Sequence, residues 1–169
     1  MRESQASIVA WANQTFGPAA STVRVVARAN EEMAELLRAI TWGAEPSKIA
    51  VEAADVAIVL CRAAAAVNEM PLFSNAAAAR SEAPLKPALH ANRAIADLLL
   101  EIDRSGGGAE FFVARLITRA FFFLHRVCEA AGSTLAEEVD SKMAINRART
   151  WNLDGSGHGY HVRADQDAA

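Results

Sequence analysis

The sequence contains few cysteines, few aromatic residues and little net charge. Cys61 and Cys128 are its two cysteines, and each stands within a run of helical spacing. We therefore expect two buried free thiols and a cytoplasmic protein. Aromatic residues make up 7% of the 169 residues and the formal charge is −3, which argues against binding to a nucleic-acid polymer. The length predicts one domain with a substantial core.

Long apolar runs are also missing. The run at 111–124 is interrupted by Arg115 and Arg119, and a membrane span needs roughly 18 uninterrupted residues. Residues 1–5 carry no apolar core of a signal peptide. We therefore expect no membrane partner.

No segment alternates polar and apolar residues with a period of two, whereas helical spacing recurs along the chain. We predict an all-α fold, a bundle of five to six helices. The expected helices are a short one before Phe16, and those at 21–41, 47–68, 88–104, 109–131 and 134–149. Residues 1–151 are predicted to form the single domain, and the glycine-rich segment 152–169 a flexible tail.

The expected helices carry apolar stripes and recognisable ends. Stripes at i, i+3, i+4 spacing predict the core positions Met33, Leu36, Leu37 and Ile40, Ile49, Val56, Leu60 and Ala63, and Val113, Leu116, Ile117, Ala120, Leu124, Val127 and Ala131. Gly43 and Gly132 are placed to end helices, and Thr134 with Glu137 forms a capping-box pattern.

Phe111, Phe112 and the triplet at 121–123 fall on one expected helix. Together they would expose more apolar surface than a monomer usually does. They therefore predict a homo-oligomer, either a homodimer or a homotetramer.

Four carboxylates fall on two neighbouring expected helices. Glu32 and Glu35 are three residues apart, as are Glu52 and Asp55, so each pair shares one helix face. The short turn between the helices makes them antiparallel neighbours, and the two pairs can converge on one point. Convergent carboxylates repel each other, which Mg²⁺ or Mn²⁺ relieves. The alternative is two solvated charged faces. Apolar flanking residues and scarce nearby basic residues, Arg38 being the close one on the first helix, weigh against it.

The last expected helix carries charge of the opposite sign. Lys142, Asn146 and Arg149 lie at i, i+4, i+7 and form one stripe. Two cations and an amide on one face suit the oxygens of a polyphosphate. The alternative is a solvated basic face at a helix C-terminus, where the helix dipole favours cations.

These residues resemble a known family. Glu31-Glu32-Met33-Ala34-Glu35 followed by Glu52-Ala53-Ala54-Asp55 is similar to the EExxE…ExxD signature of the MazG-like all-α nucleotide pyrophosphohydrolases. The run 141–149, SKMAINRAR, is similar to the segment that closes compact members. Residues 11–17, WANQTFG, together with Trp151 resemble the dATP/dGTP pyrophosphohydrolase branch, near the MazZ-like phage enzymes of 2-aminoadenine genome synthesis. Compact members of this family lack the helical pair that is expected here as an insertion at residues 67–131.

The resemblance implies hydrolysis of purine deoxynucleoside triphosphates, dATP or dGTP, to a monophosphate and pyrophosphate. Two or three Mg²⁺ or Mn²⁺ ions would be bound by Glu32, Glu35, Glu52 and Asp55, and activated water would attack the α-phosphate. Glu35 is the preferred water-orienting residue, and Glu31 is a ligand, an outer partner or the base. The resemblance further implies that Lys142, Asn146 and Arg149 bind phosphate. It also implies a catalytic role for Lys142.

The base pocket follows the same resemblance. Trp42, seven residues after Glu35, would stack on the base, with Phe16, Trp11 and Asn13 as partners. Trp42 could instead cap the helix as a core residue. The sequence does not distinguish adenine from guanine as the preferred base. If the protein is phage-encoded, its expected location is the host cytoplasm.

Two other functions stay open. One is a housecleaning pyrophosphatase for dCTP, dUTP or modified nucleotides. The other is a non-enzymatic helical interaction protein, whose carboxylates would scatter over exposed faces.

Overall fold

The computed structural model describes residues 2–67, 83–105, 110–153 and 159–161. Most of this part of the chain is helical, which confirms the all-α class. Its helices are α1 (Gln5–Phe16), α2 (Thr22–Thr41), α3 (Pro46–Ala66), α4 (Leu85–Ser105), α5 (Glu110–Ala130) and α6 (Leu135–Ala148).

A short hairpin follows α6. Strand β1 (Trp151–Leu153) pairs antiparallel with β2 (Gly159–His161), so that Trp151 lies opposite His161. The hairpin occupies part of the segment 152–169, for which the sequence predicted a flexible tail. Three-residue strands are too short to show an alternating pattern. The remainder of the predicted flexible tail, 154–158 and 162–169, lies outside the described residues.

The helix ends are set by local residues. Ser21 and Thr134 are the N-caps of α2 and α6, and the side chain of each accepts a backbone N–H of the first turn. Pro46 stands in the first turn of α3, where its missing N–H costs nothing. Gly43 and Gly132 follow α2 and α5 with φ values of +70° and +80°, a conformation that glycine adopts without strain.

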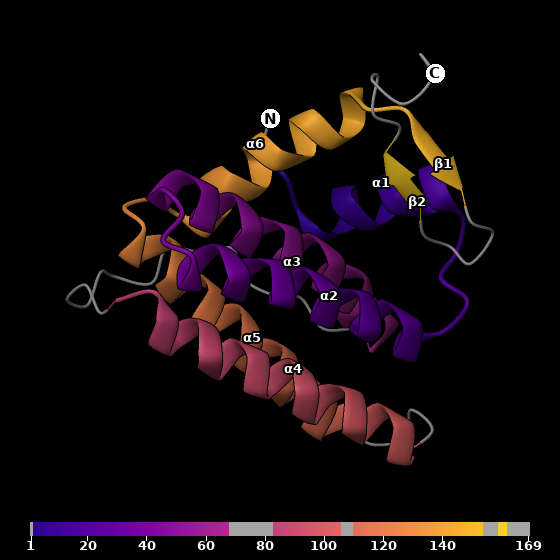
Figure 1. The fold of residues 1–169 in the computed structure, drawn as a ribbon. Coiled ribbons are helices and arrows are strands. Elements are labelled where there is room, and N and C mark those ends of the chain that lie inside the picture. The colour runs from indigo at the N-terminus through magenta and orange to yellow at the C-terminus, as the bar shows by residue number, and fades with distance from the viewer. Residues whose placement is uncertain (1, 68–82, 106–109, 154–158, 162–169) are drawn as a thin grey trace, which may run out of the picture.

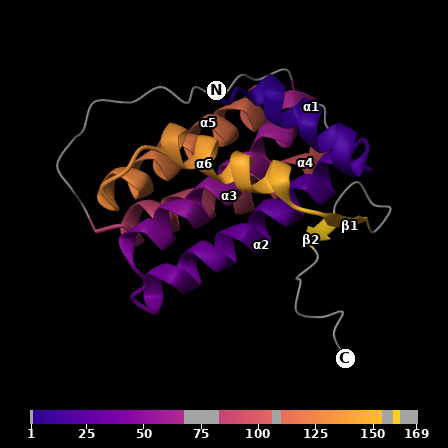
Figure 2. The ribbon, with the colours of Figure 1, turned by 90° about the horizontal axis from the view of Figure 1, so that it is seen from above.

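The helices form three layers (Figure 1). The antiparallel pair α2–α3 is in the middle, and α4–α5 packs on one side of it, with α4 against α2 and α5 against α3. On the other side, α6 and α1 contact α3. Figure 2 shows α6 lying across α3. Within the region 67–131, expected to contain an inserted helical pair, the described residues form α4 and α5.

Most positions of the predicted apolar stripes are buried in the core, whereas Leu37, Ile40, Leu116 and Ala131 are partly buried and pack against it. Met33 and Leu36 of α2 are fully buried with Leu60 of α3 and the facing side chains of α4 and α5 in one cluster. Cys61 and Cys128 are both buried and free, which confirms the expectation of two thiols. Many of the α3 positions in this cluster are alanines, which let the neighbouring helices approach α3 closely.

Hydrogen bonds and an ion pair connect the N-terminal segment to α6. The backbone N–H of Glu3 donates to Oδ1 of Asp140 at 2.6 Å. The guanidinium of Arg147 donates to both carboxylate oxygens of Glu3, at 3.1 and 2.9 Å. Segments almost the whole chain apart in sequence therefore lie side by side.

The outer face of α5 carries exposed phenylalanines together with Arg115 and Arg119, which lie over the rings of Phe111 and Phe123. Phe111, Phe112 and Phe122 are exposed, whereas Phe121 is buried and Phe123 stacks on His90. Across the described residues, no helix combines the length and apolar character that a membrane crossing requires.

Because these phenylalanines are exposed, we still predict a homo-oligomer. Covering Phe111, Phe112 and Phe122 would remove their exposed apolar surface from water, at about 25 cal/mol per Å². Light scattering should therefore give a molar mass of at least twice 18.0 kDa, and Phe112→Glu should lower it. A stable monomer at high concentration would contradict the prediction.

Candidate metal and nucleotide pocket

A pocket of about 530 Å³ opens between α1, α2, α3 and α6. Its volume falls within the range of pockets that hold small molecules. The lining residues are Trp11, Ala12, Phe16, Arg28, Glu32, Glu35, Lys48, Glu52, Asp55, Ile58, Val59, Arg62, Lys142, Asn146, Arg149 and Trp151.

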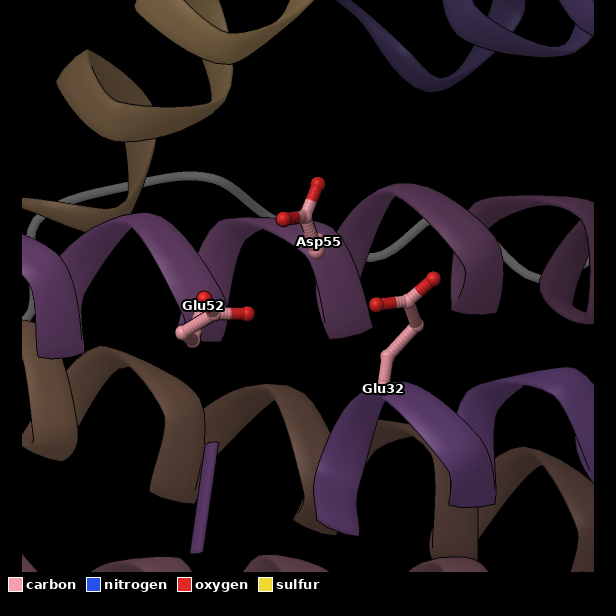
Figure 3. A group of neighbouring side chains, drawn as sticks. All are labelled: Glu32, Glu52 and Asp55. Carbon is pink, nitrogen blue, oxygen red and sulfur yellow. The ribbon is translucent and has the colours of Figure 1, made fainter. Parts of the chain in front are cut away.

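Three acids converge in this pocket. Glu32 rises from α2 toward Glu52 and Asp55 on α3 (Figure 3). One carboxylate oxygen from each lies within 4.8 Å of the others. Glu52 and Asp55 share a face of α3 because they are three residues apart, and the antiparallel packing of α2 brings Glu32 opposite them. Glu35 lines the same pocket but is exposed and is not part of this close group.

Each of the three acids has a basic partner. Arg28 pairs with Glu32, Lys48 pairs with Glu52, and Nζ of Lys142 donates to Oδ2 of Asp55 at 2.5 Å. The expectation that basic partners are scarce is therefore wrong. The sequence carried a signal for two of them, since Arg28 and Lys48 stand four residues before their acids.

The predicted stripe of α6 faces the acids across the pocket. Lys142, Asn146 and Arg149 all line it. Nη1 of Arg149 donates to Oδ1 of Asn146 at 3.3 Å, and the backbone oxygen of Asn146 accepts from Nε1 of Trp151 at 3.0 Å. The acidic end of the pocket therefore has a cationic wall.

Aromatic side chains form the opposite end of the pocket. The rings of Trp11, Phe16 and Trp151 meet edge to face, with centroids 5.0 to 6.0 Å apart. Trp151 was not expected here, because only the fold brings β1 back to α1. Along α3, the step from Asp55 to Arg62 is two helical turns, about 10 Å, and both residues line the pocket.

The structure does not bring the other predicted residues to the pocket lining. Trp42 ends α2 with 79% of its surface exposed, and Arg38 stacks on its ring. Asn13 accepts a hydrogen bond from Arg62 through Oδ1 at 3.3 Å. Glu31 is exposed and pairs with Arg28 at 2.6 Å. Of the predicted base contacts, Trp11 and Phe16 line the pocket.

Burial and crowding raise the affinity of two acids for protons. Burial, aided by the charges of Asp55, Glu35 and Glu52, raises the pKa of Glu32 to about 7, and Arg28 opposes the rise. Burial also raises the pKa of Asp55, although Lys142 lowers it. The crowded carboxylates are therefore hard to keep ionised without cations.

The pKa of Glu32 predicts a pH-dependent stability. Its ordinary value is 4.5 and its folded value about 7, so this side chain favours folding fully below pH 4.5. The benefit is lost as the pH rises through 7, by about 3 kcal/mol in the limit. Relative to Glu32→Gln, the metal-free wild type should lose stability to urea between pH 5 and 8.

Glu101→Gln is the matched control, because Glu101 lies on α4 and outside the pocket. Its stability should follow that of the wild type across the same pH range. Parallel curves for Glu32→Gln and the wild type would contradict the assignment of a raised pKa to Glu32.

The donor set fits a hard divalent cation. All the convergent atoms are carboxylate oxygens, the ligand type that Mg²⁺ and Mn²⁺ prefer. The acids come from two rigid helices, which fixes their separation. Three acids can therefore hold such a cation, and Glu35 stands beside them.

Comparisons of the chain with models of protein families, with curated proteins and with solved structures found no match.

Proposed function

We propose that this chain hydrolyses purine deoxynucleoside triphosphates, dATP or dGTP, to a monophosphate and pyrophosphate in a reaction that requires Mg²⁺ or Mn²⁺. The observation that carries the proposal is one pocket with convergent acids on one wall and Lys142, Asn146 and Arg149 on another. The resemblance to MazG-like pyrophosphohydrolases supports it and implies phage 2-aminoadenine genome synthesis as a setting.

The four acids of the pocket have two different roles in this reaction. Bound Mg²⁺ or Mn²⁺ supplies positive charge for phosphate oxygens and makes water more acidic. Glu32, Glu52 and Asp55 would hold the ions, and Glu35 would orient the attacking water and accept its proton. The water oxygen bonds to the α-phosphorus while the bond from that phosphorus to the bridging oxygen breaks, and pyrophosphate leaves.

The wall formed by α6 stabilises the departing charge. Lys142 and Arg149 donate to phosphate oxygens, where charge develops as the bond breaks. Asn146 is buried and held by Arg149, so its amide is positioned to bind a phosphate or the sugar. The base then extends along α3 toward the aromatic end.

The decisive experiment supplies the metal and a panel of nucleotides. With Mn²⁺, dATP or dGTP should yield monophosphate and pyrophosphate in equal amounts, and a chelator should stop the reaction. A preference for dCTP, dUTP or modified nucleotides would favour the housecleaning alternative. No turnover of any nucleotide would favour a non-enzymatic interaction protein, although the convergence of its acids counts against that reading.

Substitutions of two tryptophans test where the base of the nucleotide binds. Stacking of a base on an aromatic ring contributes about 1–3 kcal/mol, so Trp11→Leu should raise KM for the purine nucleotide about tenfold. Trp42→Leu should leave KM unchanged, because Trp42 does not line the pocket. The opposite result would place the base at Trp42, as the resemblance implies.

A further inference from the structure

The basic partners of the three acids differ in how freely they can move. The side chains of Arg28 and Lys48 are 38% and 59% exposed, whereas that of Lys142 is 12% exposed. Arg28 and Lys48 reach Glu32 and Glu52 from the preceding turn of the same helix, through long flexible stems. They can therefore leave these acids without disturbing the helix packing.

The acids need these partners whenever no metal is bound. Glu32 and Glu52 are buried, and a buried carboxylate without a counter-charge is strongly unfavourable. A divalent cation needs the same oxygens at about 2 Å. An ammonium or guanidinium group hydrogen-bonded to those oxygens competes for them, so cation binding displaces it.

We propose that Arg28 and Lys48 are exchangeable counterions, which neutralise Glu32 and Glu52 in the metal-free protein and turn to the polyphosphate when divalent cations bind. Both side chains line the same pocket as the acids, so an anion bound there is within their reach. This inference rests on the proposed function and adds two phosphate-binding residues to it.

The exchange couples two binding events. A metal ion alone must displace Lys48, which gains no new partner, and Arg28, which keeps its pair with Glu31, and this displacement weakens metal binding. A metal ion that arrives with polyphosphate provides the displaced groups with an anion. Metal and polyphosphate therefore strengthen each other's binding, a coupling that commonly amounts to about 5- to 150-fold. Lys142, enclosed at Asp55, does not need to move away.

Titration calorimetry of Lys48→Gln tests the coupling. Mn²⁺ alone should bind about tenfold more tightly to the variant than to the wild type, and the preformed Mn²⁺–pyrophosphate complex about tenfold more weakly. Arg28→Gln should show the same pair of opposite changes. Arg93→Gln is the matched control, because Arg93 pairs with Asp97 at the same i, i+4 spacing but does not line this pocket.

Chemical modification follows the exchange directly. The sequence has three lysines, Lys48, Lys86 and Lys142, so their methylation can be read separately by mass spectrometry. In the wild type, Lys48 should react more readily after Mg²⁺ is added and become protected again with Mg²⁺ and pyrophosphate. Lys86, on α4 and outside the pocket, is the internal control.

The outcomes of these experiments distinguish failure of this inference from failure of the proposed function. Unchanged affinities in Lys48→Gln, or equal protection of Lys48 with and without Mg²⁺, would overturn the exchange and leave the metal site standing. Failure of the wild type to bind Mn²⁺ would overturn the proposed function and the exchange together.

Discussion

Replacement of Glu52 with glutamine should abolish the metal-dependent release of pyrophosphate. Glu52 is buried and supplies one of the three convergent carboxylates. Glutamine keeps its shape but removes the charge that holds a divalent cation. Loss of one electrostatic contact to a reaction's developing charge costs about 10²–10³-fold in turnover, and loss of a metal ligand should cost at least as much. Pyrophosphate release under saturating Mn²⁺ measures the effect.

Unfolding cannot explain that loss, because Glu52→Gln removes one of several mutually repelling charges. The metal-free variant should unfold at a temperature no lower than the wild type does. Glu101→Gln on α4, outside the pocket, is the control and should retain full turnover. Wild-type turnover in Glu52→Gln would contradict the metal-dependent mechanism.

The second large effect is expected at Lys142, which has both a structural and a catalytic role. Lys142→Met leaves the mostly buried carboxylate of Asp55 without its lysine partner, which costs less than the roughly 3–5 kcal/mol of a fully buried pair. It also removes a donor to the phosphates, which should lower turnover by about 10²–10³-fold. Urea denaturation and pyrophosphate release measure the two effects separately.

A double variant separates these two roles. Asp55→Asn combined with Lys142→Met removes both charges and should recover much of the lost stability but none of the activity. Arg147→Met, also on α6 but paired with Glu3 outside the pocket, should keep its turnover. Recovery of activity in the double variant would contradict both the donor role of Lys142 and the metal-binding role of Asp55.

The sequence predicted the helices and the acidic pairs because both depend on local spacing. The periodicity of apolar residues placed Met33, Leu36 and Leu60 in the core, and glycine marked the ends of α2 and α5. The i, i+3 spacing placed Glu52 and Asp55 on one face. A short turn was enough to bring Glu32 to them.

The remaining features depend on how distant segments pack. Trp151 reaches the aromatic end through a hairpin of three-residue strands, too short for a pattern to reveal. Trp42 has the spacing of a pocket residue, yet the last turn of α2 carries it away. Whether Arg28 pairs with an acid or with solvent depends on burial, which the sequence does not specify.

The attachment of the N-terminus to α6 has a consequence for the order of folding. The layers α2–α3 and α4–α5 contain contacts between segments that are neighbours in sequence, whereas the pocket is walled by α1 and by α6. Glu3 meets Asp140 and Arg147 only after nearly the whole chain has closed on itself, and such loop closures are entropically expensive. During refolding, helical signal should therefore return before nucleotide binding does, because the pocket is completed last.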